Sequence, residues 1–137
     1  MTSRRIEDLL GLLMAVIVAD KRTFAEEIQA FLTQAQKLQT TLKIKPKWSE
    51  AKTLMWYEMN KGIVAEQALG PNLETWLYER VNRLAPIKDK GAILEAMRLI
   101  AIADGEMHVS EHALILLTAR QWVLYPHGDK PQNRAAS

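Results

Sequence analysis

Apolar residues recur at helical spacing along almost the whole chain. The first run follows the i, i+3, i+4, i+7, i+11 pattern of a single helix face, in Ile6, Leu9, Leu10, Leu13 and Ile17. This run predicts a helix that extends to about residue 19. Nowhere do apolar and polar residues alternate as they do in a half-buried strand, so the pattern predicts an all-α fold.

Capping and helix-breaking residues divide the first half of the chain. Thr23 and Glu26 have the spacing of a capping box, which predicts the start of a second helix that fades near residue 42. Trp48 and Ser49 begin a third helix. We expect Gly62 to end it, because glycine is the commonest residue just after a helix.

The second half of the chain is divided in the same way. Asn72 is placed to cap a helix that stops before Pro86. An apolar helix is predicted over residues 89–103, followed by a break at Gly105, and a last long helix over residues 109–124. The sequence therefore predicts six to seven helices around one core.

Length and composition agree with a single globular domain. The 137 residues are about one domain's worth, and 48% hydrophobic with 25% charged residues is typical of globular proteins. We expect one helical domain over residues 1–125 and a flexible tail over 126–137. The absence of cysteine excludes disulfides, thiolate nucleophiles and cysteine-bearing zinc sites.

The longest uncharged run covers residues 9–19. Its eleven residues fall short of the roughly 20 that a membrane-spanning helix needs. Arg4 and Arg5 precede it as in a signal peptide, but Glu7 and Asp8 interrupt that pattern. We therefore interpret the run as a buried helix and expect a cytoplasmic protein.

Two similar segments stand near the two ends of the chain. Val-Ile-Val-Ala-Asp ends at Asp20, and Ile-Ala-Ile-Ala-Asp ends at Asp104. A glutamate follows seven residues later in both copies, as Glu27 and Glu111, so both pairs are separated by 84 residues. A register that pairs Glu26 with Glu111 is possible, but the 84-residue offset also aligns apolar positions in the helices that follow. The sequence therefore predicts an internal repeat of a helix pair.

The second copy, over residues 102–111, reads Ile-Ala-Asp-Gly-Glu-Met-His-Val-Ser-Glu. It resembles the TerB-like (tellurite-resistance protein B) family, whose helix pairs carry an Ala-Asp-Gly turn, a branched residue and a glutamate seven after the aspartate. The resemblance covers nearly the whole chain through the two repeats. The first copy departs from the pattern, with Lys21 in place of the glycine and Thr23 in place of the branched apolar residue. Gly105 adopts a left-handed conformation easily, whereas Lys21 would do so at a cost of about 1 kcal/mol.

The resemblance implies a compact bundle with two pseudo-symmetric helix-pair repeats. It also implies a non-enzymatic, metal-responsive module that binds a divalent cation and is linked to tellurite resistance or stress response. The implied partners are other proteins, including membrane-associated stress-response components at the inner membrane face. The alternative is a metal-free protein-interaction or dimerisation domain, for which a homodimer is one arrangement.

The two aspartates favour a cation in the second repeat. We expect Asp20 and Asp104 at helix C-termini, where the helix dipole disfavours a carboxylate by up to about 1 kcal/mol. Lys21 and Arg22 supply positive charge beside Asp20, whereas no base lies nearer to Asp104 than Arg98. A bound cation is therefore more plausible at Asp104.

The two glutamates complete the predicted metal sites. Glu27 and Glu111 belong to first helical turns, where the dipole favours the ionised carboxylate. We predict Asp104 and Glu111 as the principal ligands and Asp20 with Glu27 as a weaker counterpart. Oxygen ligands suit calcium, magnesium or manganese. The other interpretation is structural: each Asp stabilises a turn and each Glu complements a dipole.

The sequence His-x-x-Glu-His at residues 108–112 matches an inverted zinc-protease motif. Such an enzyme needs a third protein ligand, and the only later acid is Asp129 in the tail. We expect His108 and His112 to serve at most as additional ligands, for zinc for example. Since phosphate-binding glycine loops and nucleophile elbows are also absent from the sequence, we expect no enzyme.

A basic segment surrounds Trp48, and its lysines are Lys37, Lys43, Lys45, Lys47 and Lys52. Basic residues around an aromatic one are typical of a nucleic-acid contact. A net charge of only +2 favours instead a solvated linker in which Trp48 packs against the fold. We therefore expect exposed lysines and no specific nucleic-acid partner, with weak and salt-dependent binding at most.

Overall fold

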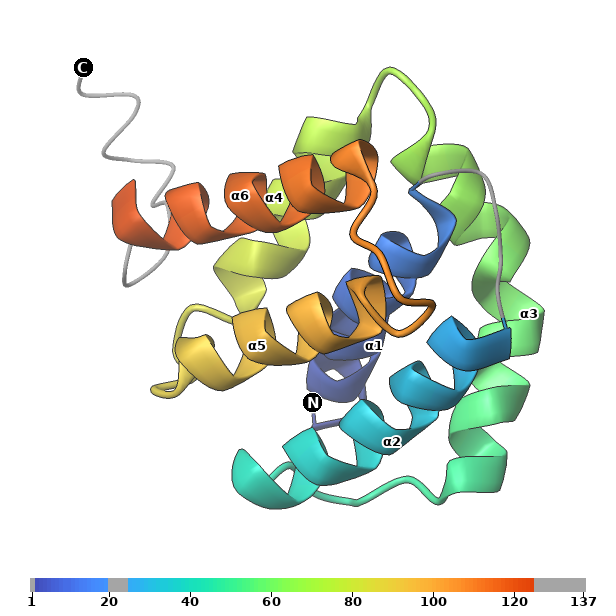
Figure 1. The fold of residues 1–137 in the computed structure, drawn as a ribbon. Coiled ribbons are helices and arrows are strands. Elements are labelled where there is room, and N and C mark those ends of the chain that lie inside the picture. Colours follow the sequence, from blue (N-terminus) through green and yellow to red (C-terminus); the bar gives the residue numbers. More distant parts are fainter. Residues whose placement is uncertain (1, 20–24, 125–137) are drawn as a thin grey trace.

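The chain folds into a bundle of α-helices (Figure 1). The computed structural model describes residues 2–19 and 25–124. Six helices lie in these ranges: α1 (Thr2–Val18), α2 (Ala25–Thr41), α3 (Glu50–Ala68), α4 (Leu73–Arg83), α5 (Lys90–Ala101) and α6 (Val109–Leu124). Neither range contains a strand. The predicted all-α class is therefore confirmed, and the six helices of the described ranges agree with the predicted six to seven.

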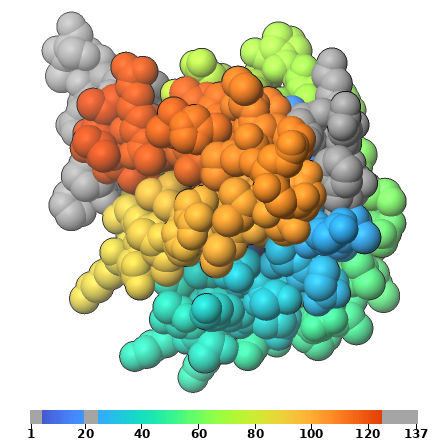
Figure 2. Space-filling view, in the orientation of Figure 1, coloured from blue at the N-terminus to red at the C-terminus, as the bar shows by residue number. Residues whose placement is uncertain are grey.

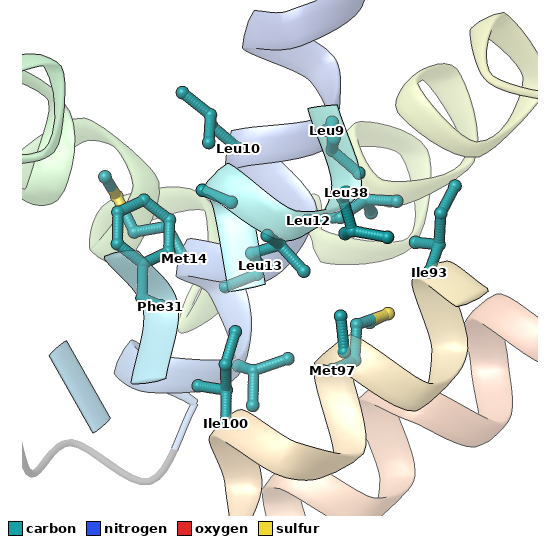
Figure 3. Packing of buried hydrophobic residues seen from close by; sticks show 14 of the residues in the cluster. Leu9, Leu10, Leu12, Leu13, Met14, Phe31, Leu38, Ile93, Met97 and Ile100 are labelled. Carbon is teal, nitrogen blue, oxygen red and sulfur yellow. The ribbon is translucent and has the colours of Figure 1, made fainter. Parts of the chain in front are cut away.

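Helix α1 is the centre of the bundle and contacts each of the other five helices. Leu9, Leu13 and Ile17 have no exposed surface, and the residues between them are buried as well. Figure 3 shows α1 side chains facing Phe31 of α2 and Met97 of α5. A helix that is apolar on all sides is stable only when covered on all sides. The prediction of a buried helix over residues 9–19 is thus confirmed for residues 9–18.

None of the described helices is long and apolar enough to cross a membrane.

The predicted start of the third helix at Ser49 is confirmed, α5 has a cap that was not predicted, and the predicted cap at Asn72 is wrong in its detail. The side chain of Ser49 accepts a hydrogen bond from the backbone N–H of Lys52 at 3.1 Å, and α3 begins at the next residue. The side chain of Asp89 accepts one from the N–H of Ala92 at 3.0 Å before α5. Asn72 precedes α4 as predicted, but its side chain makes no capping hydrogen bond. The predicted cap at Thr23 lies outside the described residues.

The prediction that Gly62 ends the third helix is wrong. Helix α3 continues to Ala68, and its last turn closes where the N–H of Leu69 donates to the carbonyl of Ala65 at 3.0 Å. A glycine inside a helix costs about 0.5–1 kcal/mol relative to alanine. Val64 and Ala68, which follow Gly62, are both buried. Their burial outweighs that local cost, so the helix continues.

The helices form two neighbouring pairs, α1 with α2 and α5 with α6. Helix α1 packs on α2 and α5 on α6, and α2 and α5 pack against each other. In Figure 1 the end of α5 lies near the start of α2. Figure 2 shows the surface of the α5–α6 turn adjoining that of the first residues of α2. The α5–α6 turn and the start of α2 therefore lie on one side of the molecule.

Candidate functional site

The α5–α6 turn begins earlier than predicted. Helix α5 ends at Ala101, not near residue 103, because the chain tightens beyond it: the N–H of Ala103 donates to the carbonyl of Ile100 at 3.2 Å. Gly105 then takes a φ of 101°, in the region that favours glycine, as predicted. Asp104 consequently lies in the turn rather than at the end of the helix.

Asp104 is held by two donors from its own turn. Its Oδ2 lies 3.1 Å from Nε2 of His108, and its Oδ1 accepts a hydrogen bond from the backbone N–H of Glu106 at 3.3 Å. The bond from His108 lowers the pKa of Asp104 below its usual value and outweighs the opposing effect of burial, and the Glu106 N–H lowers the pKa further. The ionised Asp104 therefore stabilises the fold above the pKa of an unfolded aspartate. This contribution is lost as the pH falls through the lower folded pKa.

The expectation that no base lies nearer to Asp104 than Arg98 is wrong. His108, four residues after Asp104, supplies the partner. Arg98 is engaged instead by Glu95, with 2.9 Å between Nε and Oε1. The four-residue spacing of Asp104 and His108 in the sequence is the signal that could have indicated this hydrogen bond.

Glu111 is buried in the first turn of α6, where it was predicted. Its Oε1 accepts a hydrogen bond from the backbone N–H of His108 at 3.1 Å. A glutamate at the third helical position that reaches back to the residue before the helix is half of a capping box. His108 thus connects the two predicted principal ligands, through its ring to Asp104 and through its backbone to Glu111.

Glu27 occupies the same position in α2 as Glu111 does in α6. Both are the third residue of their helix, and neither has any exposed surface. Asp20, the other acid predicted for the first repeat, lies outside the described residues, as do Lys21 and Arg22. The structure therefore places Glu27 but does not describe its predicted partner.

The two histidines of the His-x-x-Glu-His motif face different groups. His108 bonds to Asp104, whereas Nδ1 of the exposed His112 lies 3.3 Å from the sulfur of Met107. Over residues 2–19 and 25–124, no three side chains of His, Asp or Glu are grouped so that they could hold a metal ion. The described residues thus supply carboxylates of suitable chemistry but not a complete set of ligands.

The basic segment matches its structural prediction. Its five lysines are exposed, namely Lys37, Lys43, Lys45, Lys47 and Lys52. Trp48 is only 6% exposed, and its backbone N–H donates to Oε1 of buried Gln39 at 2.6 Å. The ammonium of Lys52 lies 4.6 Å from the centre of the Trp48 ring. Trp48 therefore anchors the segment to α2, as the linker interpretation predicts.

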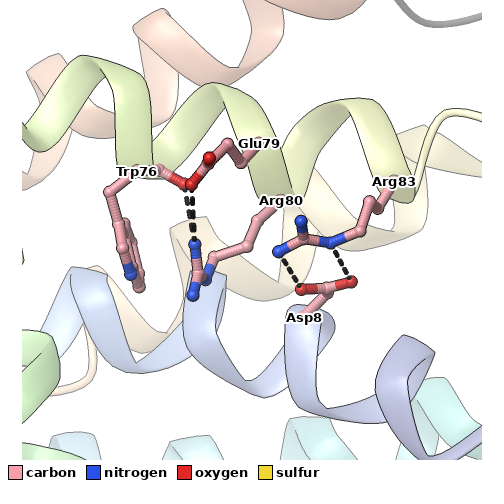
Figure 4. Close-up of polar contacts among 5 residues, drawn as sticks. All are labelled: Asp8, Trp76, Glu79, Arg80 and Arg83. Carbon is pink, nitrogen blue, oxygen red and sulfur yellow. Dashed lines mark hydrogen bonds and ion pairs between the residues drawn. The ribbon is translucent and has the colours of Figure 1, made fainter.

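An ion pair between buried Asp8 of α1 and the more exposed Arg83 of α4 was not predicted from the sequence, and Figure 4 shows it. Asp8, which is 5% exposed, accepts two hydrogen bonds from Arg83, at 2.8 Å from Nε and 2.9 Å from the second nitrogen. This bidentate contact raises the pKa of Arg83. Beside it, the guanidinium of Arg80 lies 4.1 Å from the centre of the Trp76 ring. These contacts fix α4 on the central helix and are structural.

Comparison with known proteins gives no relative: no protein-family model, no curated protein and no solved structure matches the chain. The resemblance to the TerB-like family therefore rests on the residues of the two repeats.

Proposed function

We propose that the protein is a non-enzymatic, TerB-like module that binds a divalent cation where its two helix pairs turn. It would act in a metal- or tellurite-linked stress response through contacts with other proteins, in the cytoplasm or at the inner face of the membrane. The observation that carries this proposal is the burial of Glu27 and Glu111 at matching helix positions. Carboxylates are rarely buried so completely unless their charge is matched by donors, cations or metal ions.

The helix boundaries support the repeat on which the proposal depends. Helices α2 and α6 begin 84 residues apart, at Ala25 and Val109. This is the offset that relates Asp20 to Asp104 in the sequence. The ends of α2 and α6, Thr41 and Leu124, agree with the same offset to within one residue. This agreement supports the pseudo-twofold relation between the helix pairs that we propose.

The chemistry of the acids indicates the class of metal. Carboxylate oxygens suit calcium, magnesium or manganese, and a contribution from His108 or His112 would extend the range to zinc. Asp104 and Glu111 are the principal ligands in this proposal, with Glu27 and Asp20 as the weaker pair. Because the described residues do not form a group of three ligands, the proposed site needs donors beyond these side chains, and water supplies such donors in many calcium and magnesium sites.

Thermal unfolding with each metal against a chelator tests the proposal. A cation that binds only the folded protein stabilises it by about 2.7 kcal/mol at a concentration 100 times its Kd. We expect Asp104→Asn to remove most of the metal-dependent rise in Tm and Asp20→Asn to remove less. Glu111→Gln should also reduce the rise. Glu74→Gln should leave it unchanged, since Glu74 is an exposed glutamate in the first turn of α4.

A metal-free domain is the second candidate, and the hydrogen bonds of the α5–α6 turn favour it. Asp104 and Glu111 both accept hydrogen bonds from His108 in the structure. If these acids are only structural, Asp104→Asn lowers the Tm by the same amount with metal and with chelator, and no metal raises the Tm of the unaltered protein. Equal losses of the metal effect in Asp104→Asn and Asp20→Asn would instead indicate one site shared by both repeats.

A further inference from the structure

Helix α3 carries large side chains on two opposite faces. Its inner face is buried through Thr53, Tyr57, Val64 and Ala68. Residues four positions apart share a helix face, and on the opposite side Met55, Met59 and Ile63 are 64%, 74% and 60% exposed. We call Met55, Met59, Gly62 and Ile63, with Lys52 and Glu66 at the two ends, the outer face of α3.

The outer face is large for an isolated molecule. Helix α3 runs along one edge of the bundle (Figure 1) and packs against α1, α2 and α4. Soluble proteins rarely expose a contiguous row of large apolar side chains unless it meets a partner. A helix that is apolar on both sides is typical of one covered on both sides.

Gly62 gives a second indication that another helix approaches here. It lies inside α3 between Met59 and Ile63, and a Cβ atom at this position would meet nothing within 4 Å. The folded chain itself therefore does not require glycine at this position. A glycine in the middle of an apolar helix face allows a second backbone to come close.

The charges at the ends of the outer face determine which partner and which orientation fit. Lys52 lies at the N-terminal end and Glu66 at the C-terminal end, and both are exposed. Two parallel copies of α3 would place Lys52 against Lys52 and Glu66 against Glu66. Two antiparallel copies place each Lys52 opposite Glu66 of the second copy, which is attractive at both ends.

We propose that the protein forms a homodimer in which the α3 helices of two copies pack antiparallel about a twofold axis at Met59. In this register Met55 lies opposite Ile63 of the second copy. Gly62 lies opposite Trp56, which is partly buried and is the largest side chain bordering the face. The face is thus complementary to itself in shape and charge, as a twofold interface requires.

The expected dimer is reversible. One helix from each copy buries less area than the roughly 1,200–2,000 Å² of a standard specific interface. We therefore expect dissociation in the micromolar range. The outer face of α3 shares no residue with the proposed metal site, whose principal ligands lie in the α5–α6 turn and at the start of α6, and within the described ranges α3 makes no contact with α5 or α6.

Sedimentation velocity of the full chain from about 1 to 500 µM measures the dimer directly. We expect the sedimentation coefficient of the unaltered protein to rise with concentration. Met59→Glu places two carboxylates together at the twofold axis, and Gly62→Lys blocks the close approach of the helices. Both should raise the Kd at least about tenfold while circular dichroism shows unchanged folding. Leu116→Glu, which alters an exposed leucine of α6, should leave the Kd unchanged.

Charge reversal tests the orientation. Lys52→Glu and Glu66→Lys each place like charges opposite one another at both ends, so each should weaken the dimer about tenfold. The double variant Lys52→Glu/Glu66→Lys restores opposite charges and should recover the affinity of the unaltered protein to within about threefold. A chain that is monomeric throughout overturns the proposal, as does a dimer insensitive to Met59→Glu and Gly62→Lys. A double variant as weak as the single variants overturns the antiparallel arrangement.

Discussion

Two buried acids show how differently this chain stabilises negative charge. Glu111 accepts its hydrogen bond from the backbone N–H of His108, three residues away. Asp8 is paired with Arg83, which is 75 residues distant in the sequence. The first arrangement follows from local helix geometry, whereas the second exists only once α1 and α4 have packed together. Loss of the Asp8 pair therefore affects the packing of two helices, and its contribution is measurable by substitution.

We expect Arg83→Gln to lower the free energy of unfolding by about 1–2 kcal/mol, because it leaves the buried Asp8 carboxylate without its two charged hydrogen bonds, while water reaches the Arg83 side of the pair. Urea denaturation measures the change. The matched control is Arg98→Gln, which breaks an exposed ion pair with Glu95 inside one helix and should have little effect. An equal decrease in the free energy of unfolding in the two variants would show that the Asp8–Arg83 pair stabilises the fold no more than an exposed ion pair does.

Helix boundaries were predictable where a single side chain decides them. Ser49 and Asp89 accept backbone N–H groups as their residue types indicate. The prediction that α3 ends at Gly62 was wrong because the tendency of glycine to end helices is a local preference. The burial of Val64 and Ala68 is a tertiary effect that outweighs it. Gly62 still destabilises the folded helix relative to alanine, so replacing it with alanine should increase the free energy of unfolding.

Gly62→Ala should raise the free energy of unfolding by about 0.5–1 kcal/mol, since alanine is the better helix former and its Cβ meets nothing within 4 Å. Chemical denaturation well below the Kd of the proposed dimer measures the change on the monomer alone. The control is Gly105→Ala. It should be destabilising, because Gly105 has a φ of 101° that alanine adopts only with strain. A destabilising Gly62→Ala would show that α3 does not continue through this residue.

At the scale of the whole molecule, the sequence predicted which segments are helices better than which of them meet. The uninterrupted apolar run over residues 9–19 indicated the buried helix, since no exposed helix carries apolar side chains on every side. The nearness of Asp104, in the α5–α6 turn, to Glu111, in the first turn of α6, also follows from their spacing in the sequence. The Asp8–Arg83 pair and the outer face of α3 do not, because both depend on the arrangement of helices that are distant in sequence. The hydrogen bond from His108 to Asp104 could be predicted from the sequence, because a histidine four residues after an aspartate is able to donate to it.

The central position of α1 predicts that the bundle unfolds as one unit. Leu13→Ala removes a fully buried side chain from the helix that touches all five others, and we expect a loss of about 2–5 kcal/mol. This is a large part of the 5–15 kcal/mol that stabilises a typical domain. The four tryptophans lie before or in α3 (Trp48 and Trp56), in α4 (Trp76) and in α6 (Trp122). Fluorescence therefore reports on these three helices, whereas far-ultraviolet circular dichroism reports on all of them. In Leu13→Ala the unfolding midpoints of both signals should move together to a lower urea concentration. Leu116→Ala, at a 55% exposed position, should leave both midpoints nearly unchanged. Separate transitions in the two signals would show that some helices are stable without α1.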